Sequence, residues 1–472
     1  MLDSAAGNAL VCPMSTTRRE FLLGGISATA WTSLYGRSPS RDTPRLRLGV
    51  MSDIHVQRKD DSPSRLFKRA LNWCRAQDVD GVLLAGDLTE EGLEDQLEYV
   101  AETYFSFFPG DKGRDGRDVC RLVITGNHDI GEFWYRRLKD RGEAVVAEFR
   151  NRSLTHHRDR IWRKCWNEPW EPIFKKSVNG TSFVGAHWTC WNEKSLADFF
   201  AKNPMEPSRP FLYAQHSHPR GTVYGAVQGD VDDGSSTKFF ADKPDAIVFS
   251  GHSHRPVRDA RAIWQGGFTS IATGAVSQAF VTSGCENSTF RIGREGVSHM
   301  QMFDGRDSAT VLLVDFYADR FVVRRQDVVH DERIAEDWVV PLPIAGTWAF
   351  EPRSAAARAP EFPAYAKVSV EVCDGKNRRR EPEKQVVVKF PRALPSTGDT
   401  MTEKYRVTVV ADGKDVLSRT VFARGHFYEE ERVRKLVKEE SCVFGADEIP
   451  PGSSFRVAPI DEWGHVGREI AS

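Results

Sequence analysis

Short apolar runs, each ending abruptly at polar residues, recur through the first part of the chain. The runs are Leu46–Met51, Gly81–Ala85, Val119–Ile124, Thr181–Ala186, Pro210–Gln215 and Ala246–Ser250. Runs of this length, bounded by glycine or polar residues, are typical of buried strands. Amphipathic stretches at Ser64–Cys74 and Glu90–Phe107 separate the first three runs and predict helices. Strands that alternate with helices predict an α/β fold with parallel pairing.

A different pattern follows from Gly267 onward. Alternation in Val311–Phe316 and Phe321–Val323, on either side of a short turn, predicts a β-hairpin. A stretch rich in proline and alanine, Pro343 to Pro360, then marks a boundary. Beyond it, short alternating strands recur at Ala366–Val372, Gln385–Phe390, Tyr405–Val410 and Phe455–Ala458. They predict a small β-sandwich. We therefore expect a leader and linker at 1–44, an α/β domain at 45–342 and an all-β domain at 360–472.

Composition narrows the class of partner. The 472 residues include 65 basic and 66 acidic side chains, and 40% of the residues are hydrophobic. These values are ordinary for a folded protein, and the chain is long enough for two or three domains. Because the net charge is close to zero, no nucleic-acid-binding surface is indicated.

The eight cysteines show neither CxxC pairs nor regular spacing. This argues against a zinc ribbon and against a disulfide scaffold. Cys165 and Cys190 flank one segment and could pair in an oxidising compartment. Two reduced core cysteines explain the spacing at least as well.

The N-terminus has the pattern of an export signal. Arg18 and Arg19 precede a short, weakly apolar stretch of small residues, Gly24–Trp31, and this resembles a bacterial twin-arginine signal. The resemblance implies the twin-arginine export machinery as a partner and an exported, periplasmic or extracytoplasmic protein. No clear Ala-x-Ala site follows, so an uncleaved signal could remain as an anchor, and translation could start at Met1 or Met14. A disordered basic leader is the alternative.

Side chains of the kind that bind metals or move protons stand where the apolar runs end. They are Asp53, His55, Asp87, Asn127, His128, Asp129, His216, His252 and His254. Open α/β sheets bind ligands at the carboxyl ends of their strands, so these side chains are expected to meet. Asp53 and His55 lie two residues apart on an extended segment and therefore share one face. The triplet 127–129 suits neither a strand nor a helix and is expected to lie in a turn.

The residue types define the expected chemistry. Carboxylates, an amide and neutral imidazoles, without thiolates, suit Mn, Fe or Zn. The ligands are too many for one ion, whereas two divalent ions about 3.5–4 Å apart, bridged by one carboxylate, would use them all. Such a pair lowers the pKa of a bridging water to about 7 and clamps phosphoryl oxygens. The expected reaction is hydrolysis of a phosphoester by attack of a metal-bridging hydroxide.

Taken in order, the motifs resemble those of the calcineurin-like metallophosphoesterase superfamily. They are Asp-x-His, Gly-Asp, Gly-Asn-His-Asp, His and Gly-His-x-His, spread over residues 45–330. A single one of these motifs carries no information, but the five motifs in this order are specific to the superfamily. The resemblance implies a four-layer α/β/β/α sandwich with a dinuclear metal site at the strand ends.

The resemblance also implies roles for the residues. One metal would be held by Asp53, His55, Asp87 and His254. The second metal would be held by Asp87, as the bridge, with Asn127, His216 and His252. His128 would not bind metal but would donate a proton to the leaving alkoxide or stabilise the transition state. Asp129 would orient His128.

Three points stay open. The family often has His-x-Pro where this chain reads His216-Ser217-His218-Pro219, so His218 could be the ligand or a substrate contact. We choose His216 because it stands where the strand ends. His187 is a further site candidate, although a structural, hydrogen-bonded role is the stronger interpretation. Several tryptophans could line a substrate cleft, but packing is favoured; they are Trp134, Trp162, Trp166, Trp170, Trp188 and Trp191.

Together these features predict an exported dinuclear-metal phosphoesterase that acts on a phosphodiester or a phosphomonoester. A diesterase of cyclic nucleotides or phospholipid head groups is a second enzymatic interpretation. The alternative from another class is a non-catalytic cell-surface binding protein that uses the C-terminal β-sandwich, and the complete ligand set argues against it. The last hairpin of that sandwich, Phe455–Pro459 followed by Trp463–Gly467, resembles the ending of fibronectin type III-like domains.

Overall fold

The computed structural model describes strand β1 (Leu10–Val11) and residues 43–59, 61–130, 138–224, 232–280, 284–289, 298–343, 346–394, 400–426, 435 and 437–472. The arginine pair of the predicted export signal, Arg18 and Arg19, and the tryptophan Trp134 lie outside these residues. Across the described part of the chain, every helix is too short or too polar to cross a lipid bilayer.

One seven-stranded sheet contains the first three predicted strands. Its order is β13 (Glu332–Arg333), β12 (Arg320–Asp327), β11 (Thr310–Phe316), β2 (Leu46–Met51), β3 (Gly81–Ala85) and β4 (Cys120–Ile124), with β14 (Trp338–Pro341) paired to β12. Strands β2, β3 and β4 are parallel, as the alternation of strands and helices predicts. The predicted hairpin is also confirmed, because β11 and β12 pair antiparallel along their whole length.

The second seven-stranded sheet packs against the first. Its order is β1, β5 (Ile173–Val178), β6 (Thr181–Ala186), β7 (Phe211–Ala214), β8 (Ala246–Ser250), β10 (Thr269–Ala272) and β9 (Ile263–Gln265). Strands β6, β7, β8 and β10 are parallel. Apolar side chains from both sheets form one buried cluster, which includes Leu48, Leu83, Leu212 and Ile247. Burial of these two apolar faces stabilises the domain.

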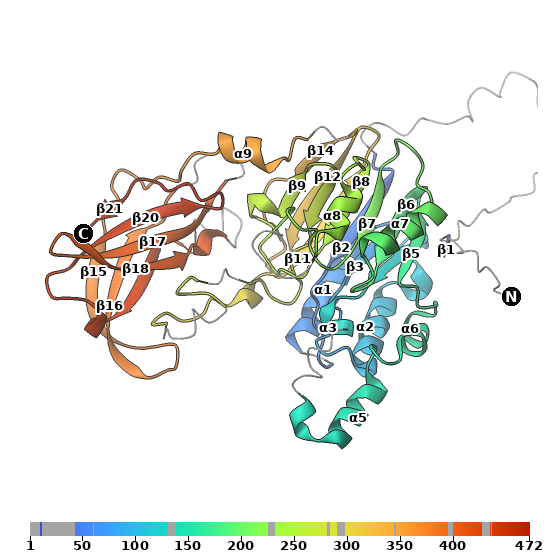
Figure 1. Ribbon diagram of the computed structural model, residues 1–472, viewed down its shortest axis with the longest axis horizontal. Helices are drawn as coiled ribbons and strands as arrows, with labels where there is room; N and C mark the ends of the chain where they lie inside the picture. Colours follow the sequence, from blue (N-terminus) through green and yellow to red (C-terminus); the bar gives the residue numbers. More distant parts are fainter. Residues whose placement is uncertain are drawn as a thin grey trace, which may run out of the picture.

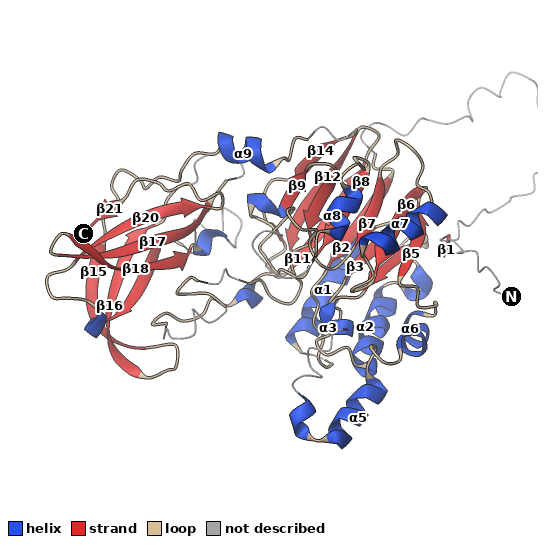
Figure 2. Cartoon of the chain, viewed as in Figure 1, coloured by secondary structure: helices blue, strands red, loops and turns tan. Residues whose placement is uncertain are grey.

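Helices cover the outer face of each sheet and complete four layers (Figure 1, Figure 2). On the first sheet lie α1 (Ser62–Ala76), α2 (Glu94–Phe107) and α6 (Arg158–Trp166). On the second lie α7 (Glu193–Lys202) and α8 (Ser235–Phe240). Helix α1 begins where the Asp61 carboxylate accepts a hydrogen bond from the Ser64 N–H, at 2.7 Å. The predicted α/β/β/α sandwich is confirmed.

Shorter helical segments connect these elements. They are η1 (Pro109–Asp111), α3 (Asn127–Ile130), η2 (Lys139–Arg141), α5 (Glu143–Arg152), η3 (Ala260–Ala262), η4 (Gly305–Asp307), α9 (Phe350–Ala356), η5 (Arg424–His426) and η6 (Ala446–Glu448). Helix α6 carries Cys165, which is buried, and Cys190 follows β6. Both carry free thiols, so the pairing that the sequence left open is not formed.

The C-terminal region is all-β, as predicted. One antiparallel sheet has the order β15 (Ser369–Lys376), β16 (Pro382–Pro391) and β19 (Glu439–Gly445). The other has the order β18 (Lys414–Phe422), β17 (Thr402–Ala411), β20 (Ser454–Asp461) and β21 (Ile470–Ala471). The two sheets share a core that includes Val388, Phe390, Tyr405 and Val407. The likeness to fibronectin type III domains stays a prediction.

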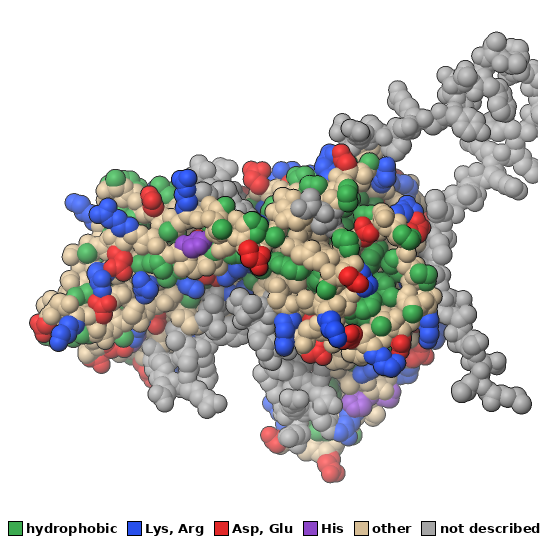
Figure 3. Space-filling view, turned by 45° about the horizontal axis from the view of Figure 1, so that its top comes forward, with side chains coloured by type: hydrophobic (Ala, Val, Ile, Leu, Met, Phe, Trp, Pro, Cys, Tyr) green, Lys and Arg blue, Asp and Glu red, His purple; other side chains and the backbone are tan. Residues whose placement is uncertain are grey.

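Buried charges join the two regions. Arg261 Nη2 donates to Asp259 Oδ2 and, across the boundary, to Glu403 Oε1, at 2.6 Å each. His426 Nε2, from the C-terminal region, lies 3.0 Å from the same oxygen, Asp259 Oδ2. We call these four residues the interdomain cluster. On the face drawn in Figure 3, basic and acidic side chains are interspersed over both regions.

Candidate metal centre

The residues predicted to bind metal converge from the carboxyl ends of five strands. Asp53 and His55 follow β2, Asp87 follows β3 and Asn127 follows β4, all in the first sheet. His216 follows β7, and His252 and His254 follow β8, in the second sheet. The centre therefore lies where the parallel strand ends of both sheets meet, in agreement with the general rule for α/β folds.

The backbone of these loops is held in an uncommon conformation. Five of the seven predicted ligands have positive φ angles: Asp53 (54°), His55 (55°), Asp87 (49°), His252 (70°) and His254 (53°). Such angles are uncommon for residues other than glycine and cost about 1–3 kcal/mol each when the region is strained. They persist because neighbouring loops bind one another; the N–H groups of Asp53 and His55, for example, donate to the carbonyl oxygens of Gly86 and Asp87 at 3.0 Å.

Two glycines, Gly86 and Gly126, allow the loops that carry the predicted ligands to pack against one another. Gly86 has φ of 93°, and a Cβ at this position would lie 2.4 Å from His216 Nδ1. A Cβ at Gly126 would lie 2.1 Å from Asp87 Oδ1. Neither position has space for a side chain. Glycine before Asp87 and before Asn127 is thus a packing requirement of the centre.

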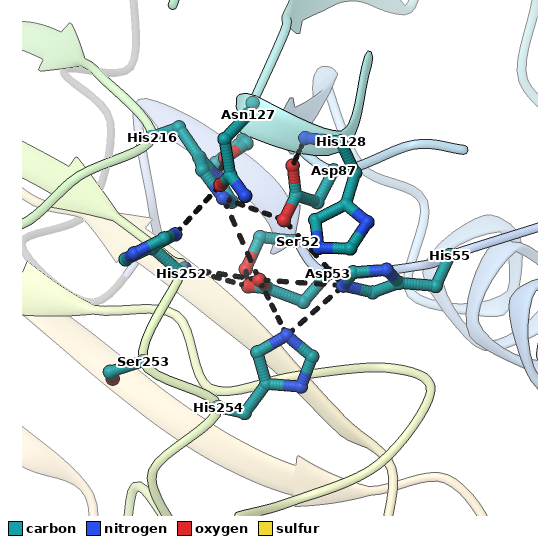
Figure 4. Close-up of polar contacts among 12 residues, drawn as sticks. Ser52, Asp53, His55, Asp87, Asn127, His128, His216, His252, Ser253 and His254 are labelled. Carbon is teal, nitrogen blue, oxygen red and sulfur yellow. Dashed lines mark hydrogen bonds and ion pairs between the residues drawn. The ribbon is translucent and has the colours of Figure 1, made fainter. Parts of the chain in front are cut away.

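The first group of ligand atoms comes from Asp53, His55, Asp87 and His254, all buried, with ligand atoms within 4.8 Å of one another. His254 Nε2 lies 3.0 Å from Asp53 Oδ1 and 3.0 Å from His55 Nε2. Figure 4 shows the imidazoles of His55 and His254 directed at the Asp53 carboxylate. This is the set that the resemblance implies for one metal.

The second group comes from Asp87, His216 and His252. Asn127 belongs beside them, because its Oδ1 lies 2.8 Å from His252 Nδ1. Asp87 Oδ2 lies 3.1 Å from His216 Nε2 and 3.6 Å from His55 Nε2, so this one carboxylate stands between the two groups. The geometry places Asp87 where a bridging ligand is expected.

The histidines direct ring nitrogens towards the centre. In three of them Nδ1 faces an outer acceptor: Glu90 Oε2 for His55 (2.7 Å), the Gln278 carbonyl for His254 (2.9 Å) and the Ala85 carbonyl for His216 (2.8 Å). Nδ1 therefore carries the proton, and each Nε2 directs a lone pair inward. His216 Nε2 is buried and has no hydrogen-bond partner. Lone pairs facing carboxylates and one another require a cation, so the residues present fit two divalent ions.

The charges of the centre are strongly coupled. Burial raises the pKa of Asp53, but His254 and His216 bring it below its usual value. Burial lowers the pKa of His216, but Asp87 and Asp53 outweigh this effect and raise it to about 9. Burial, with the nearby His216, lowers the pKa of His252 to about 4. Protons and metal ions must therefore compete for the same nitrogen atoms.

His128 stands at the rim of the centre, outside the two groups that contain Asp87 but in a third group of possible ligand atoms with His55 and Glu90. Its backbone N–H donates to Asp87 Oδ1 at 2.8 Å, and its Nδ1 donates to the Glu90 carbonyl oxygen at 2.9 Å. The half-buried ring contacts His55 edge to face, with centroids 4.5 Å apart. The sequence pattern predicts a non-helical turn here, but His128 lies in one turn of α-helix, α3.

The Asp129 carboxylate binds the backbone of the neighbouring loops, and its role in orienting His128 stays a prediction. Its carboxylate accepts hydrogen bonds from the N–H groups of Leu88, Thr89 and Gly126, at 2.8–3.1 Å, and from the Thr89 hydroxyl. These bonds tie the loop after β3 to the loop after β4. The buried carboxylate thus accepts from four donors.

Glu90 is the residue that the sequence reasoning missed. Its Oε2 accepts the His55 Nδ1 proton and lies 3.6 Å from His128 Nδ1. It touches both a predicted ligand and the predicted acid. Its position three residues after Asp87 is the available signal, but the sequence pattern predicts that a helix starts at Glu90, whereas α2 begins at Glu94.

The two uncertain histidines are both structural in their contacts. His218 is buried between the hydroxyls of Ser250 and Ser253, 2.7 Å from each, so both ring nitrogens are occupied. His216, not His218, reaches the centre. His187 accepts a hydrogen bond from the Thr125 N–H at 3.1 Å and stacks on Trp170 with ring centroids 3.9 Å apart.

Comparison with known families identifies this part of the chain. Residues 46–256 match the family described as calcineurin-like phosphoesterase. These residues form a calcineurin-like phosphoesterase domain. The match includes all seven predicted ligands, and with the buried Asp and His cluster it identifies a metal-dependent phosphoesterase. A comparison with curated proteins finds no match.

Solved structures similar to the chain include phosphoesterases. A dimetal phosphatase from Danio rerio is 13% identical, with a TM-score of 0.36, over 63% of this chain and 99% of that one. GAP50, the anchor in the inner membrane complex of Plasmodium, is 12% identical, with a TM-score of 0.38, over 65% and 91%. A predicted phosphoesterase from Streptococcus pneumoniae is 13% identical, with a TM-score of 0.28, over 63% and 97%.

Proposed function

We propose that the protein is an exported phosphoesterase that uses two divalent ions to hydrolyse a phosphodiester or a phosphomonoester outside the cytoplasm. One observation carries the dinuclear assignment: the Asp87 carboxylate stands between two groups of inward-facing nitrogen ligands. Two bound ions supply a water of lowered pKa and positive charge opposite the phosphoryl oxygens.

The chain's own residues would hold the reacting groups and supply a proton. Asp53 and Asp87 are buried, which excludes bulk water from the floor of the centre. The Glu90 carbonyl fixes His128 through Nδ1, so Nε2 is the atom that would donate a proton to the leaving oxygen. Glu90 would fix His55 in the same way, with its Nε2 turned inward.

Hydrolysis of two substrates tests the reaction. We would reload the purified protein with Mn²⁺ and measure turnover of bis(4-nitrophenyl) phosphate and 4-nitrophenyl phosphate. Asn127→Ala should lose the activity, whereas Asn151→Ala, at an exposed site on α5, should keep it. A diester preference would identify a phosphodiesterase and a monoester preference a phosphatase. Equal activity in Asn127→Ala, or no turnover with Mn, Fe or Zn, would contradict the proposal.

A separate experiment tests export. Residues 1–44 would be fused to a reporter that folds before it is exported, and the reporter would be located by cell fractionation. The arginine pair supports export through the twin-arginine machinery, so the double change Arg18→Lys and Arg19→Lys should retain the reporter in the cytoplasm. Export that is unchanged by the double substitution, or absent in the original sequence, would overturn this assignment.

A further inference from the structure

The loop after β6 brings one tryptophan to the metal centre. The Trp188 ring centroid lies 5.7 Å from that of His252 and 5.8 Å from that of His216. Its plane is inclined by 36° to the His252 ring. Both histidines belong to the second group of ligands, so an indole forms a wall beside this group.

This indole is held in place from two sides. The backbone N–H of Trp188 donates to the Thr125 hydroxyl at 3.2 Å, which fixes the residue that carries the indole, and Thr125 directly precedes the loop that carries Asn127. Trp191 packs edge to face against Trp188, with ring centroids 5.2 Å apart, and is itself buried under α7. A wall that is fixed in advance binds a ligand without an ordering cost.

Core packing does not account for all of Trp188. Trp162 and Trp166 are fully buried, as the packing interpretation of this segment predicts. Trp188 is only half-buried, and its neighbours include polar, ionisable ligand side chains rather than a complete apolar shell. Large aromatic side chains are usually buried, so a partly exposed one beside a polar centre indicates a role other than packing. Trp188 therefore keeps part of its surface exposed beside the second ligand group.

We propose that Trp188 stacks on a planar aromatic group attached close to the phosphorus of the substrate. Aromatic rings attract one another through offset or tilted stacking, beyond the effect of apolar area. Because the indole lies beside ligands of the centre, only a group joined directly or through a short linker to the phosphoryl group would reach it. Aryl esters and nucleoside phosphates share this chemistry. The inference rests on the proposed function, since the phosphoryl group must bind at the ligand groups.

Binding of two phosphonates tests the proposal without turnover. Phenylphosphonate and cyclohexylphosphonate cannot be hydrolysed as esters and differ in the planarity of a six-membered ring. Titration calorimetry on the Mn²⁺-loaded protein should show about fivefold tighter binding of the phenyl compound. Trp188→Leu should remove this preference and change cyclohexylphosphonate binding by less than about twofold, while Trp188→Phe should keep part of the preference. Trp264→Leu is the matched control, because Trp264 is half-buried on β9 against Phe268.

The outcomes separate this inference from the proposed function. Phosphonate binding with the same phenyl preference in Trp188→Leu, or with no preference in the original protein, would overturn the role of Trp188 and leave the phosphoesterase assignment intact. Absence of both metal and phosphonate binding would overturn the proposed function itself. Methylenephosphonate analogues of adenosine 5′-phosphate and ribose 5-phosphate distinguish the two substrate classes, nucleoside phosphates and aryl esters. A Trp188-dependent preference for the adenosine analogue supports a nucleoside, and a preference confined to phenylphosphonate supports an aryl ester.

Discussion

The metal centre and the interdomain cluster both contain buried Asp and His side chains, but the charges around them are arranged differently. In the interdomain cluster, Arg261 binds both Asp259 and Glu403, and His426 lies against Asp259. In the metal centre, carboxylates lie among imidazoles whose Nδ1 atoms face outer acceptors. A buried cluster that satisfies its own charges stabilises a fold, whereas one with acceptors facing acceptors is suited to bind a cation.

The backbone differs in the same way. Asp259 has φ of −58°, a relaxed value, while Asp53 and Asp87 have φ of 54° and 49°. Strained conformations persist only where surrounding structure holds them, and they gather at functional sites. The comparison therefore predicts that changes in the metal centre affect chemistry, and that changes in the interdomain cluster affect stability.

The largest expected effect is that of Asp87→Asn. Removal of the charge shared by both ligand groups should lose at least one ion per chain and lower kcat/KM by about a thousandfold or more, because metal-stabilised charge is worth several kcal/mol. Metal analysis and turnover measure the two quantities. A variant with full metal content and full activity would remove Asp87 from the centre.

His128→Ala should lower turnover by about 10²–10⁴-fold, the usual contribution of a general acid. His128 belongs to neither of the two groups assigned to metal, so the ion content should not change. Measuring kcat together with the metal content by mass spectrometry shows whether His128 acts as an acid or as a metal ligand. Loss of an ion would show that His128 is a ligand, and unchanged kcat would remove the proposed acid.

Asp259→Asn should act on stability instead. Arg261 and His426 hold the pKa of this carboxyl well below its usual range although burial raises it. Removing one partner of a buried ion pair costs about 3–5 kcal/mol. Thermal unfolding should show a lower midpoint, while metal content and kcat stay at the original values. Loss of metal with an unchanged midpoint would reverse the assignment of the two clusters.

Glu90→Gln should weaken metal affinity by about tenfold, because the carboxylate that accepts the His55 Nδ1 proton makes the ring a better ligand. Calorimetric titration with Mn²⁺ measures the change. Glu102→Gln, at an exposed site on α2, is the matched control. Equal affinity in Glu90→Gln and the control would show that Glu90 has no influence on the centre.

The smallest expected effect is a dependence on pH. The pKa of His216 rises from 6.5 to about 9 on folding without metal. Its protonated form therefore stabilises the metal-free protein fully below pH 6.5, and this stabilisation is lost as the pH rises towards about 9. Metal needs the deprotonated ring, so the gain in melting temperature on metal binding should widen by a few degrees over this range. A gain that narrows would contradict the assignment of His216.

Much of the fold was predictable because burial leaves a clear pattern. The run Leu46–Met51 coincides with β2, and Gly81–Ala85 coincides with β3. Strand β18 was missed because most of its side chains are exposed or half-buried, which leaves little alternation to detect. Fully buried strands are therefore easier to predict than strands at a solvent-facing surface.

The centre was predictable where residue type alone determines the chemistry. The ligands follow strand ends, so their convergence could be expected from the parallel topology. The hydrogen-bond partners of Asp129 could not be predicted. They include the backbone N–H groups of Leu88 and Gly126, and because almost every residue has a backbone N–H, the sequence does not indicate which of them will bind the carboxylate. The loop contact that brings Glu90 to His55 and His128 is likewise a tertiary feature.

The most direct test of the account is the number of divalent ions bound by the metal-free full-length protein in a calorimetric titration with Mn²⁺. The account predicts two ions per chain in the original protein and fewer than two in His216→Ala, because His216 is a member of the second ligand group and not of the first. One ion or none in the original protein, or two in His216→Ala with unchanged affinity, would contradict the dinuclear centre.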